Sequence, residues 1–416
     1  MEQTYEVVIV GGGFAGVAAA KELGHKGVAV LLIDQNNYHQ FQPLLYQVST
    51  AQIGITDVTR PLRGIFRRNK RVRVITAIAT SVDATARTVT TADGNTYRGR
   101  ILVLATGAVP NFFNTPGAEE KTFPLYSAND ATRLGTRLVE LLDETDSRPN
   151  NGGVNVVVVG GGPTGVETAG ALAEMFKYVV PEYFSHSSAS KCSVHLVDMV
   201  PTVLNTFSEK SQKYARSRLA KMGAKLKLGL GVTEVRDDGV TLADGTVLPS
   251  QLVIWAGGLK AGPIIDESGL PQGRGGRIDT NPDLTAPGFD GIYVLGDAAN
   301  TTDRTGAKLP QLGSVAQQSG KWAARNIYAD LTGGAREPFK YVDKGYMAMV
   351  GRGAAVAELG KKHTQLQGPF AFIAWLAVHV VLLSGNRQRI RALFSWFENY
   401  LSHTRSHVAP AQAKAG

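Results

Sequence analysis

A glycine-rich loop that occurs twice constrains the fold of this 416-residue chain more than any other feature. Gly11, Gly13 and Gly16 directly follow the apolar run 7–10, and the Ala-rich sequence after them is typical of a helix. In such a loop the first glycine permits a tight turn, the second lets a pyrophosphate approach the backbone, and the third lets helix pack on strand. Asp34 ends the next apolar run, where an acid can accept hydrogen bonds from ribose hydroxyls. The pattern predicts a β–α–β unit that binds a dinucleotide.

The same pattern returns in the middle of the chain. Gly160, Gly162 and Gly165 follow the valine-rich run 154–159, and Asp198 ends the run 194–198. Two such units predict an α/β fold with two Rossmann-like dinucleotide-binding domains, and electron transfer between two dinucleotides. An acid at position 198 would repel a 2′-phosphate, so we expect NADH rather than NADPH.

Three further apolar segments end in small or acidic residues. Segments 101–104 and 252–255 each follow a predicted Asp-Gly hairpin, at 90–97 and 240–247. They continue into Ala105-Thr106-Gly107 and Ala256-Gly257-Gly258. The third, 291–295, ends in Gly296-Asp297, which we expect to open a helix and to bond the ribityl chain of a flavin held by the first loop.

These motifs together resemble the single-subunit type II NADH:quinone oxidoreductases. The similar stretches include GGGFAGV (11–17), NYHQFQPLLYQVST (37–50), VVVGGGPTGVETAG (157–170), YVLGDAA (293–299) and DKGYMAMVGRGAAVAEL (343–359). The resemblance implies a glutathione-reductase-like flavoprotein that takes a hydride from NADH onto FAD and passes two electrons to a membrane quinone, without proton pumping. It also implies an FAD-binding domain at 1–116 and 278–345, an NADH-binding domain at 117–277, and a membrane-anchoring or dimerisation region at 346–416 with a disordered tail.

The resemblance implies roles for individual residues as well. Glu167, on the first turn after the second loop, would orient the nicotinamide or handle protons; the alternative is an acid that merely complements the helix dipole. Lys344 would lie near the isoalloxazine and the quinone, or is a surface lysine in a turn. Pro43, Tyr46 and Gln47 would line the flavin, although Tyr46 could equally be a core aromatic. The cofactor-binding set predicted in this way is Gly11, Gly13, Gly16, Asp34, Gln47, Ala105, Thr106, Gly107, Gly160, Gly162, Gly165, Asp198, Gly258, Gly296 and Asp297.

The predicted quinone site departs from the family pattern AQxxxQ. Gly313 stands in place of the first glutamine, so Gln317 and its neighbour Gln318 are the predicted quinone-binding residues, with Gln317 also at the catalytic centre. Gln311 lies on another side of a helical turn. The identity of the quinone, and a respiratory or a biosynthetic role, stay open.

The net charge of +9 is concentrated in two basic clusters. One contains Arg60, Arg63, Arg67, Arg68, Lys70, Arg71 and Arg73, and the other Arg387, Arg389, Arg391 and Arg405. A basic surface keeps a second class open, a redox-sensing flavoprotein similar to the apoptosis-inducing-factor group that contacts protein or nucleic acid. A biosynthetic naphthoquinone reductase is a third possibility. The single Cys192 excludes a disulfide framework and argues against the sulfide:quinone branch, and we predict no metal.

The C-terminal sequence predicts two membrane-associated helices. The apolar run 370–383 is shorter than the ~20 residues that cross a bilayer. The next stretch places one apolar stripe at helical spacing, Ile390, Leu393, Phe394, Phe397 and Leu401. Such helices suit insertion into one leaflet, and we therefore expect a peripheral protein on the cytoplasmic side of the cell membrane. The alternatives are docking on the protein body or a homodimer interface.

Overall fold

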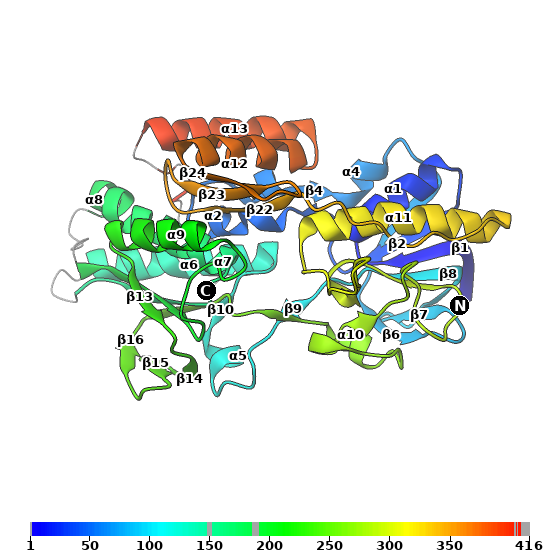
Figure 1. The fold of residues 1–416 in the computed structure, drawn as a ribbon, viewed down its shortest axis with the longest axis horizontal. Helices are drawn as coiled ribbons and strands as arrows, with labels where there is room; N and C mark the ends of the chain where they lie inside the picture. Colours follow the sequence, from blue (N-terminus) through cyan, green and yellow to red (C-terminus); the bar gives the residue numbers. More distant parts are fainter. Residues whose placement is uncertain (1, 148–151, 185–190, 403–404, 406, 409–416) are drawn as a thin grey trace. The chain divides into compact units, whose positions relative to one another are not determined.

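The computed structural model describes residues 2–147, 152–184, 191–402, 405 and 407–408. The chain divides into two compact units, the first made of residues 1–40, 60–109 and 259–342 and the second of 41–59, 110–258 and 343–416. Figure 1 labels the elements of both units. The predicted FAD-binding domain (1–116 and 278–345), NADH-binding domain (117–277) and C-terminal region (346–416) stay a prediction, because a division into compact units does not show which ligand each part binds.

The first unit is built on a sheet in the order β5-β2-β1-β8-β7-β6, with β20 also paired to β8. The edge strand β6 (Ala79–Asp83) is antiparallel to β7. Five of its strands run parallel to one another, namely β1 (Glu2–Val10), β2 (Val30–Asp34), β5 (Val72–Thr76), β8 (Thr96–Leu104) and β20 (Ile292–Val294). Val7 and Ile9 of β1 pack with the helices α1 (Phe14–His25) and α11 (Gly313–Thr332), while Val8 and Val10 pack in a second cluster on the other face. Burial on both faces explains why the parallel strands read as continuous apolar runs.

The second unit contains the second predicted nucleotide-binding sheet. Its order is β10-β17-β11-β12-β13, and all neighbours are parallel. The strands are β10 (Phe123–Pro124), β17 (Leu252–Trp255), β11 (Asn155–Val159), β12 (Ser193–Asp198) and β13 (Lys225–Leu228), with helices α6 (Ala128–Asp146), α7 (Pro163–Glu174) and α9 (Glu209–Lys221). The short helix α2 (Leu45–Ser49) packs against α6 and α7. The α/β class with two Rossmann-like sheets is therefore confirmed.

Both predicted Asp-Gly hairpins are present. In the first unit β7 (Thr88–Thr91) pairs antiparallel with β8 around Asp93-Gly94. In the second unit β15 (Gly239–Leu242) pairs with β16 (Val247–Pro249) around Asp244-Gly245, beside β14 (Val232–Arg236).

The C-terminal part of the second unit is a three-stranded sheet followed by two helices. Strands β22 (Gly345–Met349), β23 (Ala355–Leu359) and β24 (Thr364–Gly368) form an antiparallel meander. Helix α12 (Pro369–Leu382) packs on this sheet, and α13 (Asn386–Leu401) lies beside α12 (Figure 1). The two predicted helices are confirmed, and none of the helices in the described ranges has the length and apolar character needed to span a membrane. The predicted disordered tail follows His407, and its residues 409–416 lie outside the described residues.

One expectation about the third segment is wrong. Gly296-Asp297 opens only the short turn η5 (Gly296–Ala298), and the chain then extends into β21 (Ala299–Asn300). Strand β21 pairs with β19 (Ile278–Asp279), and this pairing uses the backbone groups that a helix would need. The long helix α11 begins only at Gly313.

Candidate functional site

The two glycine loops have the same geometry. The ideal Cβ of Gly11 would lie 2.1 Å from the Ala105 carbonyl oxygen, and that of Gly160 would lie 2.4 Å from the Ala256 carbonyl oxygen. The φ angles of these first glycines are +108° and +111°, in the region that favours glycine. A Cβ on either third glycine, Gly16 or Gly165, would lie 1.8 Å from the carbonyl oxygen of the first. The protein itself therefore requires these four glycines.

The middle glycines, Gly13 and Gly162, differ from the others. Apart from the glycine itself and its immediate neighbours in the chain, no atom of the described residues lies within 4 Å of an ideal Cβ at either position. Each is the N-cap of a 12-residue helix, α1 or α7, and makes no side-chain cap hydrogen bond. Helix N-termini of this kind attract phosphate through their N–H groups and dipole. The open cradle above each middle glycine fits a pyrophosphate.

Each loop is held by the predicted acid at the end of the following strand. Asp34 accepts hydrogen bonds from the backbone N–H groups of Gly12 (2.5 Å) and Asn36 (2.6 Å). Asp198 accepts from the N–H of Gly161 and, at 2.7 Å, from that of Val200. Burial raises the pKa of Asp34, and the Gly12 N–H opposes that shift. Both carboxyl groups remain half-buried at the edge of their loops.

Two further residues, His39 and Thr106, lie beside the first loop. His39 was not among the predicted site residues, and Thr106 was. His39 Nδ1 donates to the Gly12 carbonyl at 3.0 Å, and burial lowers the pKa of His39 to about 4, so the ring is neutral. The Thr106 hydroxyl, at the end of β8, is buried and has no hydrogen-bond partner among the described residues. A buried hydroxyl of this kind calls for an acceptor or donor from a ligand. Gly107, which follows, has a φ of +72°.

The third segment lies against the first loop helix. An ideal Cβ at Gly296 would be 3.3 Å from the Ala15 side chain, in the first turn of α1. Gln311 Nε2 donates to the Asp297 carbonyl at 3.2 Å. Within the first unit, Gly11, Asp34, Thr106 and Asp297 therefore come from four segments that meet around one loop.

The predicted quinone residues are spread over different environments. An ideal Cβ at Gly313 would lie 3.3 Å from the Phe14 ring, which fills the space beside this position. The Gln318 side chain makes two hydrogen bonds with the backbone of Val342: its Nε2 donates to the carbonyl oxygen and its Oε1 accepts from the N–H, each at 3.0 Å. These hydrogen bonds give the side chain a structural role. Gln317 is half-buried, and Lys344, in the second unit, is exposed.

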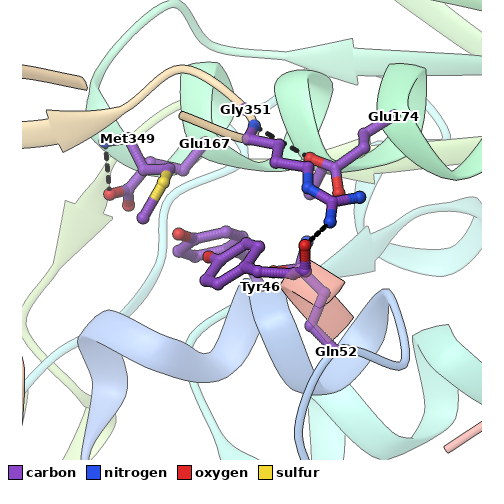
Figure 2. Close-up of a pocket in the computed structure, with 9 residues that line it drawn as sticks. Tyr46, Gln52, Glu167, Glu174, Met349 and Gly351 are labelled. Atoms are coloured by element: carbon purple, nitrogen blue, oxygen red, sulfur yellow. Dashed lines mark hydrogen bonds between the residues drawn. The ribbon is translucent and has the colours of Figure 1, made fainter. Parts of the chain in front are cut away.

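Glu167 lies in a narrow pocket of the second unit (Figure 2). The pocket is lined by Tyr46, Gln52, Glu167, Ala171, Glu174, Met349, Gly351, Arg352 and Tyr400. Glu167 sits on the second turn of α7 and not the first, because the helix begins at Pro163; its Oε1 accepts the Met349 N–H at 3.0 Å. Burial raises the pKa of Glu167 to about 8, against the opposing hydrogen bond from the Met349 N–H. The carboxyl is therefore protonated at neutral pH.

Gln47, the chain neighbour of the pocket residue Tyr46, is fully buried. Its Nε2 donates to the Tyr46 hydroxyl at 3.1 Å, and its Oε1 accepts the Trp396 indole N–H at 2.7 Å. Trp375 of α12 lies edge-on to Tyr46, with ring centroids 6.4 Å apart, and stacks on His379 at 3.7 Å. The sequence motif located Tyr46 and Gln47, but the apolar composition of the C-terminal helices gave no sign that Trp375 and Trp396 would reach them.

The other end of the pocket holds a buried ion pair. Arg405 Nη2 lies 3.6 Å from Glu174 Oε1, and its guanidinium also donates to the carbonyls of Thr50 (2.5 Å) and Ala171 (3.2 Å). Glu174 Oε2 accepts the Arg352 N–H at 2.9 Å. The prediction that Arg405 belongs to a basic surface cluster is wrong, because its carbonyl and carboxylate partners lie inside the unit.

Gly258, the remaining predicted cofactor residue, follows β17. Its φ is +145°, and an ideal Cβ would lie 3.1 Å from the Phe113 ring. The Gly258 carbonyl accepts the Asn111 N–H at 3.0 Å. The second unit thus brings Gly160, Gly162, Gly165 and Asp198 together in one loop, while Gly258 contacts the segment 111–113.

Comparisons with known proteins agree with this arrangement. Residues 5–320 match the family described as pyridine nucleotide-disulphide oxidoreductase. The type II NADH:quinone oxidoreductases Ndh and NdhA of Mycobacterium tuberculosis are 34% and 35% identical to this chain, over 99% and 97% of it and 91% and 89% of their own lengths. The structure of NDH2 from Plasmodium falciparum in complex with NADH superposes with a TM-score of 0.87 at 17% identity, covering 95% of this chain and 98% of that one. Membership of both groups follows from the extent of these matches: the chain belongs to the type II NADH:quinone oxidoreductases, a branch of the pyridine nucleotide-disulphide oxidoreductases.

Proposed function

We propose that this chain oxidises NADH and passes two electrons through FAD to a membrane quinone. The observation that carries the proposal is the matched pair of glycine loops, in which the middle glycines Gly13 and Gly162 leave an open cradle. Two dinucleotides in one chain are what hydride transfer from NADH to a flavin requires. The names of the mycobacterial relatives support the same reaction and favour it over a redox-sensing interaction module.

The first loop would hold FAD. Gly11, Gly13 and Gly16 would receive the pyrophosphate, Asp34 the ribose hydroxyls, and Asp297 the ribityl chain, with the Thr106 hydroxyl as a further contact. FAD, when bound, supplies an isoalloxazine that accepts a hydride and releases electrons in pairs. The protein's part is to orient the two dinucleotides and to exclude water from them.

The second loop would hold NADH. Asp198 stands at the end of β12, where its carboxylate can accept hydrogen bonds from both ribose hydroxyls and would repel a 2′-phosphate. We expect kcat/KM for NADH to exceed that for NADPH by at least tenfold. Equal values for the two nucleotides would contradict this assignment.

Glu167 would carry the proton that the reaction consumes. Reduction of a quinone to a quinol takes two electrons and two protons, and a hydride brings only one proton. Because Glu167 is buried and protonated at neutral pH, it is suited to donate the second. Lys344 and Gln317 are proposed at the acceptor end through the family resemblance, with Lys344 stabilising negative charge on the acceptor.

Anaerobic stopped-flow spectroscopy of the flavin tests this function directly. NADH should bleach the oxidised flavin absorbance, and a short-chain quinone added afterwards should restore it. Failure of the first step would remove the NADH assignment, and failure of the second would remove the quinone.

We further propose that the hairpin α12–α13 holds the enzyme on the cytoplasmic face of the cell membrane. The apolar residues that are exposed on it include Phe370, Ile373, Val381, Ile390, Phe394, Phe397 and Leu401, with Phe370 at 77% and Phe394 at 71% exposure. An apolar face of this kind suits the acyl boundary of a bilayer, in which quinones dissolve. A homodimer through the same face is the competing occupant, and sedimentation in detergent-free buffer distinguishes the two.

A further inference from the structure

His363 lies between two carboxyl groups, in the turn that joins β23 to β24. Its Nε2 donates to Asp343 Oδ2 at 3.0 Å, and its Nδ1 lies 3.9 Å from Glu358 Oε2. The ring also packs on Tyr346 of β22, with ring centroids 5.5 Å apart. An imidazolium can donate from both nitrogens, whereas a neutral imidazole carries only one N–H. The charged form of His363 therefore fits this position better than the neutral form.

Glu358 is a fixed anion in this cluster. Its side chain is only 4% exposed. Its Oε1 accepts from the Ser208 hydroxyl at 2.6 Å and N–H at 2.8 Å, and from the Ser211 hydroxyl at 2.7 Å. Burial opposes ionisation, but these hydrogen bonds hold the pKa of Glu358 below its usual range. At neutral pH the carboxylate is thus charged, and its second oxygen faces His363.

The backbone of the turn also points to a role for the His363 side chain. Its φ is +48°, in the left-handed region that residues other than glycine adopt at a cost. Its N–H donates to the Gly360 carbonyl at 2.9 Å and closes the turn. A glycine would adopt this conformation more easily. The contacts with Asp343 and Glu358 are what the histidine provides in its place.

Asp343 connects this cluster to Lys344. The Asp343 Oδ1 accepts the Gly345 N–H at 2.7 Å, so the carboxylate bridges across the lysine. The Lys344 carbonyl accepts the Gly360 N–H at 3.1 Å, and an ideal Cβ at Gly345 would lie 1.7 Å from a backbone oxygen of β23. The lysine side chain itself is exposed. Its direction depends on a short backbone segment, which His363 helps to hold through Asp343.

We propose that His363 is a positioning residue for Lys344, and that its protonation makes the transfer of electrons to the acceptor depend on pH. The proposal rests on the proposed function, in which Lys344 stabilises negative charge on the acceptor. With the ring protonated, Asp343 is held and Lys344 stays in place. When the proton leaves, Nδ1 becomes an acceptor that faces the Glu358 carboxylate, and the hold on Asp343 weakens.

Other titratable groups near the turn do not replace His363. On β22, Tyr346 contacts the ring, and on α9 the exposed Glu209 and Lys213 pair with each other at 2.7 Å. The titratable group of α12 is His379, whose Nδ1 lies 2.7 Å from a carbonyl of its own helix. The remaining titratable residues of α9 and of the turn are Lys210, Tyr214, Arg216, Arg218, Lys221, Lys361 and Lys362. Among the described residues, the ion pairs of His363 are those with Asp343 and Glu358.

The test compares His363→Gln with Lys362→Gln in the holoenzyme. Glutamine at position 363 keeps a donor for Asp343 but has no proton to lose, and Lys362→Gln removes an exposed charge from the same turn. The readout is kcat/KM for menadione at saturating NADH from pH 5.5 to 9, given as the ratio of wild type to variant. Glu167 titrates in both proteins, so its effect cancels in this ratio.

Below the titration midpoint of His363, the wild type should exceed His363→Gln by about fivefold, the effect of one partly exposed ion pair. Above the midpoint the two proteins should agree within twofold. The midpoint itself comes from NMR of ¹³C-labelled histidine, in which the His363 signal is the one lost in His363→Gln. Lys362→Gln should match the wild type at every pH. In a Lys344→Gln background the change at position 363 should have no effect, because it acts through the lysine.

Hydrogen exchange gives a second readout that does not depend on activity. The protection factor of the Gly345 N–H should fall in the wild type when His363 loses its proton, and stay constant with pH in His363→Gln. A ratio that does not change with pH, or an equal change in the Lys344→Gln background, would overturn the proposal. If His363→Gln does not fold, His363→Asn replaces it, because asparagine tolerates a positive φ. A wild-type flavin that NADH does not reduce, or that menadione does not reoxidise, would instead refute the proposed function, and hydrogen exchange would still decide whether His363 holds the turn.

Discussion

The glycines of the first loop differ in how closely other atoms surround them. Substitution of one should therefore lower folding stability, and substitution of another should lower flavin binding. Gly16→Ala places a methyl group 1.8 Å from a carbonyl oxygen, so we expect a loss of about 3 kcal/mol or more in the free energy of unfolding of the apoprotein. At Gly13 an added Cβ meets no described residue other than its chain neighbours within 4 Å, so we expect the Gly13→Val apoprotein to keep its stability within about 1 kcal/mol while flavin is lost. Urea unfolding and the flavin-to-protein ratio measure the two effects. A Gly13→Val protein that purifies with full flavin would contradict the role of this loop.

Glu167 should also make folding stability depend on pH. Its pKa in the folded protein is raised to about 8, against 4.5 for the ordinary carboxyl, so the folded state binds the proton more tightly than the unfolded state. This contribution is fully present below about pH 4.5, falls as the pH rises, and is lost above about pH 8, a total on the order of a few kcal/mol. We expect Glu167→Gln to flatten the decline in urea-unfolding free energy between pH 5 and 8. Parallel curves for the two proteins would argue against a buried acid.

Residue spacing predicted the geometry of the glycine loops well and the buried contacts elsewhere in the protein poorly. Gly11, Gly16 and Asp34 were identifiable because their roles depend on local backbone geometry within one β–α–β unit. The environment of Glu167 was not, because Met349 lies 182 residues away in the sequence and reaches it only through tertiary packing. The misplacement of Arg405 has the same cause.

At the scale of elements, the hairpin α12–α13 separates into an inner and an outer face. Trp375, Trp396 and Ala392 are buried, whereas the stripe that the sequence predicts on α13 is exposed. Hydrophobic periodicity identified this stripe, but it did not show that the inner faces carry the aromatic residues around Glu167.

This separation determines how membrane attachment should be tested. Phe394→Ser with Phe397→Ser removes two exposed apolar groups, and we expect binding to phosphatidylglycerol vesicles to weaken about 100-fold or more, since each Phe buried in lipid contributes roughly 1.5–3 kcal/mol. Glu398→Ser, an exposed change on the same helix, is the control; it removes a negative charge and should not weaken binding to the anionic vesicles. Vesicle sedimentation measures the difference. Unchanged binding in the double variant would exclude this face as the site of membrane attachment. Point variants are preferred to deletion from residue 370, because the deletion would also remove the buried Trp375 and Trp396.

At the scale of the molecule, residues far apart in sequence meet at Arg405. This buried guanidinium contacts Thr50 from the N-terminal part of the chain and Ala171 and Glu174 from its middle. Arg405→Met should cost about 3–5 kcal/mol of unfolding free energy, because it leaves Glu174 without its cation. The double variant Arg405→Met with Glu174→Gln should recover part of that loss. Urea unfolding of the four proteins completes the cycle, and additive losses would show that the two side chains are not coupled.

The contacts of Arg405 give the hairpin a second attachment. Helix α12 continues from β24 at one end, and beyond α13 the chain is fastened again beneath the same pocket. A segment attached to the protein at one end only can change its orientation, whereas a segment attached at both ends keeps a fixed orientation. If the hairpin α12–α13 lies in the lipid surface, the second unit would therefore keep one fixed tilt relative to the bilayer. Polarised infrared spectra of oriented bilayers would then give one narrow angular distribution for its helices, and Arg405→Met would broaden it.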